Sequence, residues 1–158
     1  MKHLEVNPIG KITTTGESFF IELTPKYIPA LQGLEGFSHL AVLWWFSDFD
    51  SDEARQVLEA PKPYKKSPDV LGIFATRSPI RPNPIALSTA EIISIDHDTG
   101  RIQLAYIDAN DQTPLLDIKP YTPSIDRVEN PKVPDWCCHW PGNIETSGDF
   151  PWEEEFNF

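Results

Sequence analysis

The stretch 72–88 carries two arginines on a backbone with little freedom. It reads GIFATRSPIRPNPIALS, and its three prolines fix their own φ angles and restrain the residues before them toward extended conformations. Arg77 and Arg81 would therefore lose little conformational entropy on binding, and a guanidinium fork suits a carboxylate or a phosphate. The same arginines could instead pair with some of the 24 acidic residues of the chain, and the sequence leaves both alternatives open.

A second polar stretch covers residues 108–121 and reads DANDQTPLLDIKPY. Asp and Asn at a turn most often bond their own backbone, which is the simplest role for Asp108 and Asn110. Asp117 and Lys119 are two residues apart on an apolar strand, so we expect them on the same face. They could form a partly buried ion pair or a catalytic acid–base pair.

The residues that bind metals are few and scattered. The two cysteines, Cys137 and Cys138, are adjacent, and neighbouring cysteines rarely close a disulfide because the ring would be strained. Neither a Cys-x-x-Cys nor a His-x-x-x-His spacing occurs. We therefore expect no disulfide framework and no metal cofactor.

The charge of the chain restricts its partners. Thirteen Lys and Arg against 24 Asp and Glu give a net charge of −11, which disfavours broad, non-specific binding of nucleic acid. Residues 126–158 hold eight acids and two bases, whereas residues 61–81 hold five bases and one acid. This basic island could meet an anionic group locally, or it could be a solvated face.

The hydrophobic pattern and the 16 prolines predict a mainly β protein of short strands. In chain order we expect a hairpin over 4–23 that turns around Gly16, a short helix that begins at Thr24, a strand over 37–46 covered on both faces, a helix over 50–60, a strand over 72–76, a hairpin of 85–95 with 101–107, and a strand over 115–118. The sequence thus predicts a small antiparallel β-barrel-like domain over 1–125, with short helices, and a C-terminal arm over 126–158. The arm is acidic and rich in aromatic residues, so we expect it to pack on the barrel or on a partner subunit.

The first ten residues, MKHLEVNPIG, lack the apolar stretch of a signal peptide, and no apolar run approaches 18 residues. We therefore expect a cytoplasmic protein with no membrane segment.

Three ordered motifs carry a family resemblance. The run GIFATRSPIRPNPIALS, the element GFSHL at 36–40 and the element TPLLDIKPY at 113–121 resemble signatures of the TsaA-like proteins, also called the TrmO or YaeB family. The resemblance spans about residues 8–123. It implies a small, dimeric β-barrel methyltransferase that uses S-adenosylmethionine. In the best-known members the substrate is tRNA, methylated on N6 of the threonylcarbamoyladenosine beside the anticodon.

The resemblance also assigns roles by position, with Arg77 as the arginine that anchors the cofactor. The other residues that it places around the cofactor are Ser47, Leu87, Ser88, Asp108, Asp111, Gln112 and Thr113. A urea-type N–H of the acceptor must lose its proton, and for this step we expect Asp117, or a water that it orients, with Lys119 as the second catalytic residue. The residues expected to hold the threonyl carboxylate or RNA phosphates are Lys65, Lys66, Arg81 and Asn83.

Three departures from the family pattern bear on function. The N-terminal Pro-Arg-Gln loop of longer members is missing, Ser47 stands where a His is common, and Gln112 replaces a Gly. Two alternatives to tRNA methylation therefore remain. One is methylation of a small-molecule acceptor. The other is a non-catalytic domain that binds S-adenosylmethionine and has a regulatory role.

Overall fold

The computed structural model describes residues 4–158, and the chain divides into two compact units. The first, here called the barrel unit, runs to Asp50 and continues over Asn83–Arg127. The second, the insert–tail unit, joins the inserted segment Ser51–Pro82 to the C-terminal segment Val128–Phe158. The predicted C-terminal arm therefore folds together with a segment that interrupts the barrel sequence.

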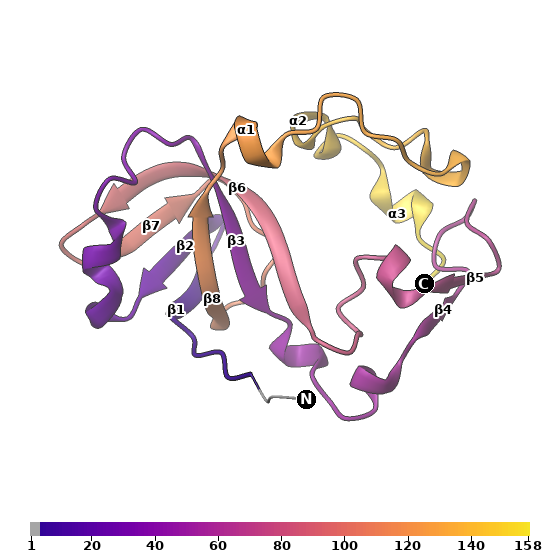
Figure 1. The fold of residues 1–158 in the computed structure, drawn as a ribbon, viewed down its shortest axis with the longest axis horizontal. Helices are drawn as coiled ribbons and strands as arrows, with labels where there is room; N and C mark the ends of the chain where they lie inside the picture. The colour runs from indigo at the N-terminus through magenta and orange to yellow at the C-terminus, as the bar shows by residue number, and fades with distance from the viewer. Residues whose placement is uncertain (1–3) are drawn as a thin grey trace. The chain divides into compact units, whose positions relative to one another are not determined.

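The barrel unit is a closed antiparallel sheet (Figure 1). Around the barrel the strand order is β1-β2-β7-β6-β3-β8, and β8 pairs back onto β1. This arrangement confirms the predicted mainly β, barrel-like fold, and full closure leaves no unpaired sheet edge. The strands are β1 (Gly10–Thr15), β2 (Ser18–Leu23), β3 (His39–Trp45), β6 (Ile85–Asp96), β7 (Arg101–Leu104) and β8 (Thr113–Pro120).

Both predicted hairpins are confirmed. β1 pairs with β2 through Thr15 and Ser18, and Gly16 between them has a φ of +61°. β6 pairs with β7 across a turn that contains Gly100, whose φ is +72°. A positive φ is readily adopted by glycine, so the two glycines set the ends of these hairpins.

The core lies inside the barrel and follows from the alternation of side chains along each strand. Leu40, Val42 and Trp44 of β3 are buried, whereas the residues between them are only partly buried. The prediction that this strand is covered on both faces is therefore met in full only on the inner face, because closure of the sheet places every second side chain inside and the others, which are partly buried, outside. Other strands add fully buried side chains to the same core, namely Ile12, Ile21, Ile102, Leu104 and Leu115.

Short helices connect and follow the strands of the barrel. The helix predicted from Thr24 is present as the 3-10 helix η1 (Pro25–Leu31), which begins with a proline as such helices often do. A second 3-10 helix, η2 (Ser47–Phe49), follows β3, and α1 (Pro123–Asp126) follows β8.

Two predictions for the inserted segment are wrong. In place of a helix over 50–60 there are a 3-10 turn, η3 (Ala54–Gln56), and the strand β4 (Glu59–Pro61). In place of a strand over 72–76 there are β5 (Val70–Gly72) and the 3-10 turn η4 (Ile73–Ala75). β4 pairs with β5 in register Glu59 to Gly72, and this tertiary pairing overrides the local preference of the segment.

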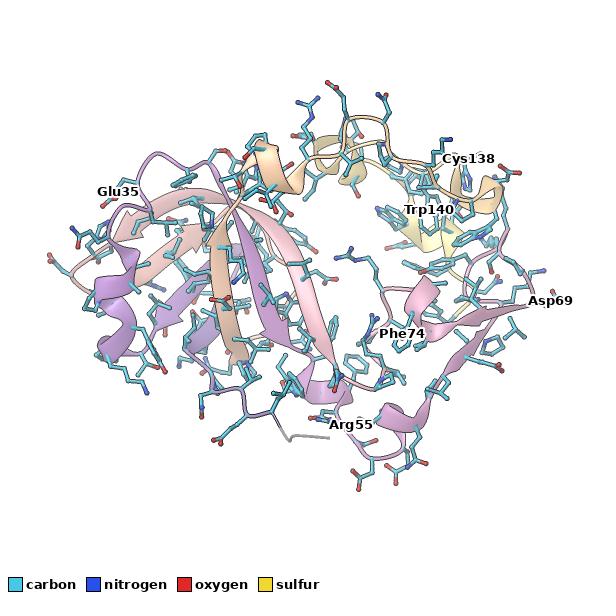
Figure 2. All side chains as sticks on the ribbon, viewed as in Figure 1. Glu35, Arg55, Asp69, Phe74, Cys138 and Trp140 are labelled. Atoms are coloured by element: carbon cyan, nitrogen blue, oxygen red, sulfur yellow. The ribbon has the colours of Figure 1, made fainter. Side chains whose placement is uncertain are left out.

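The C-terminal segment contributes short helices and an aromatic cluster to the insert–tail unit. The helices are η5 (Asp135–Cys137), α2 (Ile144–Ser147) and α3 (Trp152–Glu155). Trp140, labelled in Figure 2, packs against Tyr64 of the inserted segment and against two further tryptophans of the C-terminal segment. We call the following rings the aromatic cluster: Tyr64, Trp136, Trp140, Phe150, Trp152, Phe156 and Phe158.

One buried carboxylate lies beside this cluster. Glu155 is only 9% exposed, and it meets His139 Nε2 at 2.6 Å and accepts a hydrogen bond from Trp140 Nε1 at 3.1 Å. These two bonds lower the pKa of Glu155, because they stabilise its charged form. A charge that would be costly to bury alone is thereby paired.

None of the helices formed by residues 4–158 has the length and apolarity needed to cross a bilayer. Within 4–158, no three His, Cys, Asp or Glu side chains come together in a way that could hold a metal ion.

Closure of the barrel at Gly10 generates a first prediction. Gly10 pairs with Leu23 on one side and with Leu115 on the other, and a Cβ there would overlap the Glu22 carbonyl oxygen. We expect Gly10→Ala to lower the free energy of unfolding by about 1–3 kcal/mol, measured by thermal or urea denaturation. Gly148→Ala is the control, because a Cβ at Gly148 would meet nothing within 4 Å. Equal stability of the two variants would contradict this account of closure.

Candidate functional site

The predicted cofactor arginine lies in the insert–tail unit, on a loop that its own polar groups hold in shape. We call residues 76–82 the Arg77 loop. Thr76 is buried, and its hydroxyl donates to the Ile73 carbonyl oxygen at 2.8 Å and accepts from the Ser78 N–H at 3.2 Å. The Thr76 side chain therefore bonds the backbone both before and after Arg77, and this restrains the Arg77 backbone.

Arg81 lies on the same loop and contacts its backbone. Its Nη1 is 3.5 Å from the Thr76 carbonyl oxygen and 3.4 Å from that of Ser78, so it donates two long hydrogen bonds within the loop. Arg81 therefore supports the turn that presents Arg77. A role for Arg81 toward substrate stays a prediction.

Tyr64 is a residue of this site that the sequence did not indicate. Burial raises the pKa of its phenol, and a hydrogen bond with the Arg77 backbone and the Arg77 charge oppose that rise. Tyr64 thus lies against the Arg77 loop although it is 13 residues earlier (77 − 64 = 13). No spacing pattern marks it, because its other ring partners belong to the C-terminal segment. The predicted phosphate-binding lysines, Lys65 and Lys66, directly follow it and are exposed.

In the barrel unit, the structure brings Ser47 close to the turn 108–113. Ser47 opens η2, and the next residue, Asp48, accepts a hydrogen bond from Asn110 Nδ2 at 2.6 Å. Asp108 and Asn110 are both exposed at this turn. Two predicted parts of the cofactor site, the end of β3 and the turn before β8, therefore lie at one end of the barrel.

The rest of this turn is fixed to β1. Asp111 Oδ1 accepts from the Thr14 N–H at 2.9 Å, and this bond is the main reason why the pKa of Asp111 is lowered. Gln112 accepts from Lys11 Nζ at 2.7 Å, and Thr113 is buried at the start of β8. Asp111 and Thr113 therefore have clear structural roles. Burial raises the pKa of the Tyr106 phenol, and the charge of Asp108 adds to that rise.

Leu87 and Ser88 are neighbours on β6 and point to opposite faces of the sheet. Ser88 pairs with Val42 and accepts a hydrogen bond from the buried Trp44 Nε1 at 3.0 Å, so its hydroxyl lies on the inner side. Leu87 is 52% exposed on the outer side. The expectation that both residues line the cofactor pocket stays a prediction.

A row of side chains crosses the outside of three strands. Leu43 of β3 pairs with Leu87 of β6 on one side and with Asp117 of β8 on the other. Asp117 forms an ion pair with Lys119, and the two side chains are 46% and 63% exposed. The predicted acid–base pair thus shares a face, and the structure places it across one strand from Leu87. Asn83 begins the barrel segment that leads into β6, and it is exposed.

The predicted site residues accordingly divide between the units. Arg77, Arg81, Lys65 and Lys66 belong to the insert–tail unit. The barrel unit holds the others, in two groups. One group lies at η2 and the turn 108–113, and its members are Ser47, Asp108, Asp111, Gln112 and Thr113. The other group lies on β6 and β8 or just before β6, and its members are Asn83, Leu87, Ser88, Asp117 and Lys119.

The family to which a chain with these residues belongs follows from comparison with known families. The family described as the tRNA-methyltransferase O N-terminal domain matches residues 2–127. The chain belongs to this family. The match ends where the C-terminal segment begins, so the segment that supplies most of the aromatic cluster lies outside the family domain.

Three relatives illustrate the range of similar proteins. A probable S-adenosyl-L-methionine-binding protein of Archaeoglobus fulgidus is 39% identical over 118 residues, which are 74% of this chain and 30% of that protein. The tRNA (adenine(37)-N6)-methyltransferase of Escherichia coli is 38% identical over 101 residues, 63% of this chain and 42% of that enzyme. The crystal structure of TrmO from Pseudomonas aeruginosa matches with a TM-score of 0.65 at 30% identity, covering 85% of this chain and 62% of that one. The chain thus spans less than two thirds of each.

The backbone at Gln112 generates a second prediction. Its φ is +64°, a left-handed conformation that costs a non-glycine residue roughly 1–2 kcal/mol. We expect Gln112→Gly to be more stable to urea than Gln112→Ala by about 1 kcal/mol, because only glycine relieves the strain. The alanine variant is the control, since both substitutions remove the hydrogen bond from Lys11. A glycine variant no more stable than the alanine variant would contradict the strain.

Proposed function

We propose that this protein binds S-adenosylmethionine and methylates N6 of threonylcarbamoyladenosine in tRNA. The observation that carries the proposal is membership of the tRNA-methyltransferase O family over residues 2–127, together with the 38% identity to a tRNA (adenine(37)-N6)-methyltransferase. The Arg77 loop supports it physically, because a restrained guanidinium is a ready partner for a carboxylate.

Each unit, taken by itself, carries groups that suit the chemistry of the cofactor. In the insert–tail unit, Arg77 would pair with a carboxylate such as that of the cofactor. In the barrel unit, the exposed Asp108 and Asn110 would accept from an amino group or from ribose hydroxyls. Leu87 offers an apolar surface to a purine ring. Bound in this way, the cofactor supplies an electrophilic methyl group on a sulfonium.

The protein's own task in the transfer is positioning and proton removal. The N6–methyl bond forms as the carbon–sulfur bond breaks, and its electron pair stays on sulfur. Holding N6 and the methyl carbon about 3–3.5 Å apart before the reaction supplies much of the acceleration. The N6 proton must leave, and we assign it to Asp117, whose ion pair with Lys119 fixes the orientation of the carboxylate. Arg81, Asn83, Lys65 and Lys66 would contact the threonyl carboxylate and the phosphates of the RNA.

A second candidate function keeps the cofactor and drops the tRNA. It is favoured by the net charge of −11, which repels a polyanion at long range, and by the missing Pro-Arg-Gln loop. In that case the protein methylates a small acceptor, or it binds S-adenosylmethionine without catalysis.

Cofactor binding generates a third prediction, measured by calorimetry with S-adenosylmethionine. We expect Arg77→Ala to weaken binding about 10- to 100-fold, because a charge-assisted hydrogen bond to a carboxylate is lost. The melting temperature should stay within about 2 °C, because an exposed side chain is removed. Arg77→Lys is the matched control and should retain part of the affinity, since it keeps the charge but not the fork. Unchanged affinity in Arg77→Ala would contradict the assignment.

The acceptor is tested by a fourth prediction. Unmodified protein, S-adenosylmethionine and tRNA that carries threonylcarbamoyladenosine should yield a nucleoside heavier by one methyl group in mass spectrometry. Asp117→Asn should slow this reaction at least about 100-fold and leave cofactor affinity unchanged, because an amide cannot take the N6 proton. Cofactor binding without any methylated nucleoside would exclude tRNA and favour the second candidate.

A further inference from the structure

We propose that Phe74 and Arg81 form a nucleotide-binding surface, on which the Phe74 ring stacks on an unpaired base of the RNA and the Arg81 guanidinium holds a phosphate. The inference rests on the proposed function, because it names how the tRNA is held. It adds a contact at Phe74, which the proposed function does not use, and it commits Arg81 to a phosphate. Both residues belong to the insert–tail unit.

Phe74 is an aromatic side chain that the fold leaves in solvent. It lies on η4 and is 78% exposed, and no other ring of residues 4–158 packs against it (Figure 2). A Cβ added to Gly72, two residues earlier, would meet nothing within 4 Å, and the residue after Phe74 is Ala75. Neither neighbour therefore carries a side chain that would cover the ring, so the ring is open to stacking.

Hydrogen bonds fix the turn that carries Phe74. The Ile73 N–H donates to the Leu58 carbonyl oxygen at 2.8 Å, and the Ile73 side chain is buried. The Ile73 carbonyl oxygen accepts from the Thr76 N–H at 3.1 Å and from the Thr76 hydroxyl at 2.8 Å. Because the backbone on both sides of the ring is already ordered, little of its entropy is lost when a base stacks on Phe74.

Arg81 presents one edge of its guanidinium to solvent. Its Nη1 donates the two long bonds to the carbonyl oxygens of Thr76 and Ser78, whereas its Nε and Nη2 make no hydrogen bond or ion pair within residues 4–158. Every buried side-chain nitrogen of these residues has a hydrogen-bond partner, so Nε and Nη2 of Arg81 reach solvent. This edge carries two parallel N–H groups, the geometry that binds a phosphate with two hydrogen bonds.

The bonds made by Arg81 bring its charge to the turn that carries the ring. Thr76, whose carbonyl oxygen accepts from Arg81, is two residues after Phe74 and is bonded to Ile73 on the other side. The ring and the guanidinium therefore belong to one short, hydrogen-bonded segment. A base and a phosphate of neighbouring nucleotides in a single strand suit this pair.

The charge around Phe74 favours RNA over a protein partner. Residues 61–81 hold five bases and one acid, although the whole chain has a net charge of −11. An aromatic ring within a basic segment is the combination that binds single-stranded nucleic acid. Leu58, whose carbonyl oxygen bonds Ile73, is also exposed, so an apolar protein surface is the alternative that the test must separate.

The role of Phe74 is tested by binding of the anticodon stem–loop of a tRNA, measured by fluorescence anisotropy without cofactor. Phe74→Leu keeps an apolar side chain and removes the ring, so we expect RNA affinity to fall about fivefold or more. Phe74→Trp keeps a stacking face and should retain the affinity, whereas an apolar protein contact would not distinguish these variants in RNA binding. Phe158→Leu is the matched control, because Phe158 is 93% exposed in the same unit and lies outside the segment 73–81. It should change affinity less than about twofold.

The role of Arg81 is tested by the salt dependence of the same binding. Arg81→Gln should weaken binding and lower the slope of log K against log salt by about 0.7, because one phosphate contact to a single strand is lost. Phe74→Leu should leave the slope unchanged, since stacking releases no counterion. Weaker binding of Arg81→Gln with an unchanged slope would show that Arg81 only supports the loop.

A second arm uses the stem–loop with and without the threonylcarbamoyl group on its adenosine. A phosphate contact predicts the same loss of affinity in Arg81→Gln on both RNAs. A loss confined to the RNA that carries the threonylcarbamoyl group would assign Arg81 to the threonyl carboxylate and overturn the phosphate contact.

The outcomes separate this inference from the function on which it rests. Methylation of tRNA by the unmodified protein, with equal RNA affinity in Phe74→Leu or equal losses in Phe74→Leu and Phe158→Leu, would overturn the inference alone. RNA binding that depends on Phe74 without any methylation would overturn the proposed function alone. A dimer that Phe74→Leu converts to a monomer in size-exclusion chromatography, with RNA affinity unchanged, would show that Phe74 contacts a second copy of the chain and would overturn the inference.

Discussion

The restraint on the Arg77 backbone is the feature on which the functional account depends. Prolines limit the φ angles of the loop, and the Thr76 hydroxyl bonds both the Ile73 carbonyl oxygen and the Ser78 N–H on either side of Arg77. A guanidinium on such a backbone has less entropy to lose when it meets a carboxylate. The Arg77 loop is therefore suited to bind a carboxylate without a change in its own conformation.

The barrel places residues of different strands next to one another, whereas the Arg77 loop provides a single restrained backbone. Its closed register places Leu87, Leu43 and Asp117 side by side on the outside of three strands, and it brings η2 to the turn 108–113. Both groupings bring together segments that are far apart in the sequence. The barrel unit thus carries the acid, the polar turn and the apolar surface, and the Arg77 loop belongs to the insert–tail unit.

The sequence was most informative where local rules decide the structure. Gly16 and Gly100 marked both hairpins, and the spacing of Asp117 and Lys119 correctly placed them on one face. Prediction from the sequence failed where pairing between distant segments determines the structure. The segment 50–76 forms β4 and β5 because these two strands pair with each other, and this competes successfully with a local helix signal. Tyr64 was missed for the same reason, since Trp136 and Phe156 come much later in the chain.

The most direct test of the central claim is a crystal structure of the protein with bound S-adenosylmethionine. The account predicts that the Arg77 guanidinium lies within hydrogen-bond distance of the cofactor while the Thr76 hydroxyl keeps its bonds to the Ile73 carbonyl oxygen and the Ser78 N–H. A cofactor bound away from Arg77, with the guanidinium paired to a carboxylate of the protein, would contradict it.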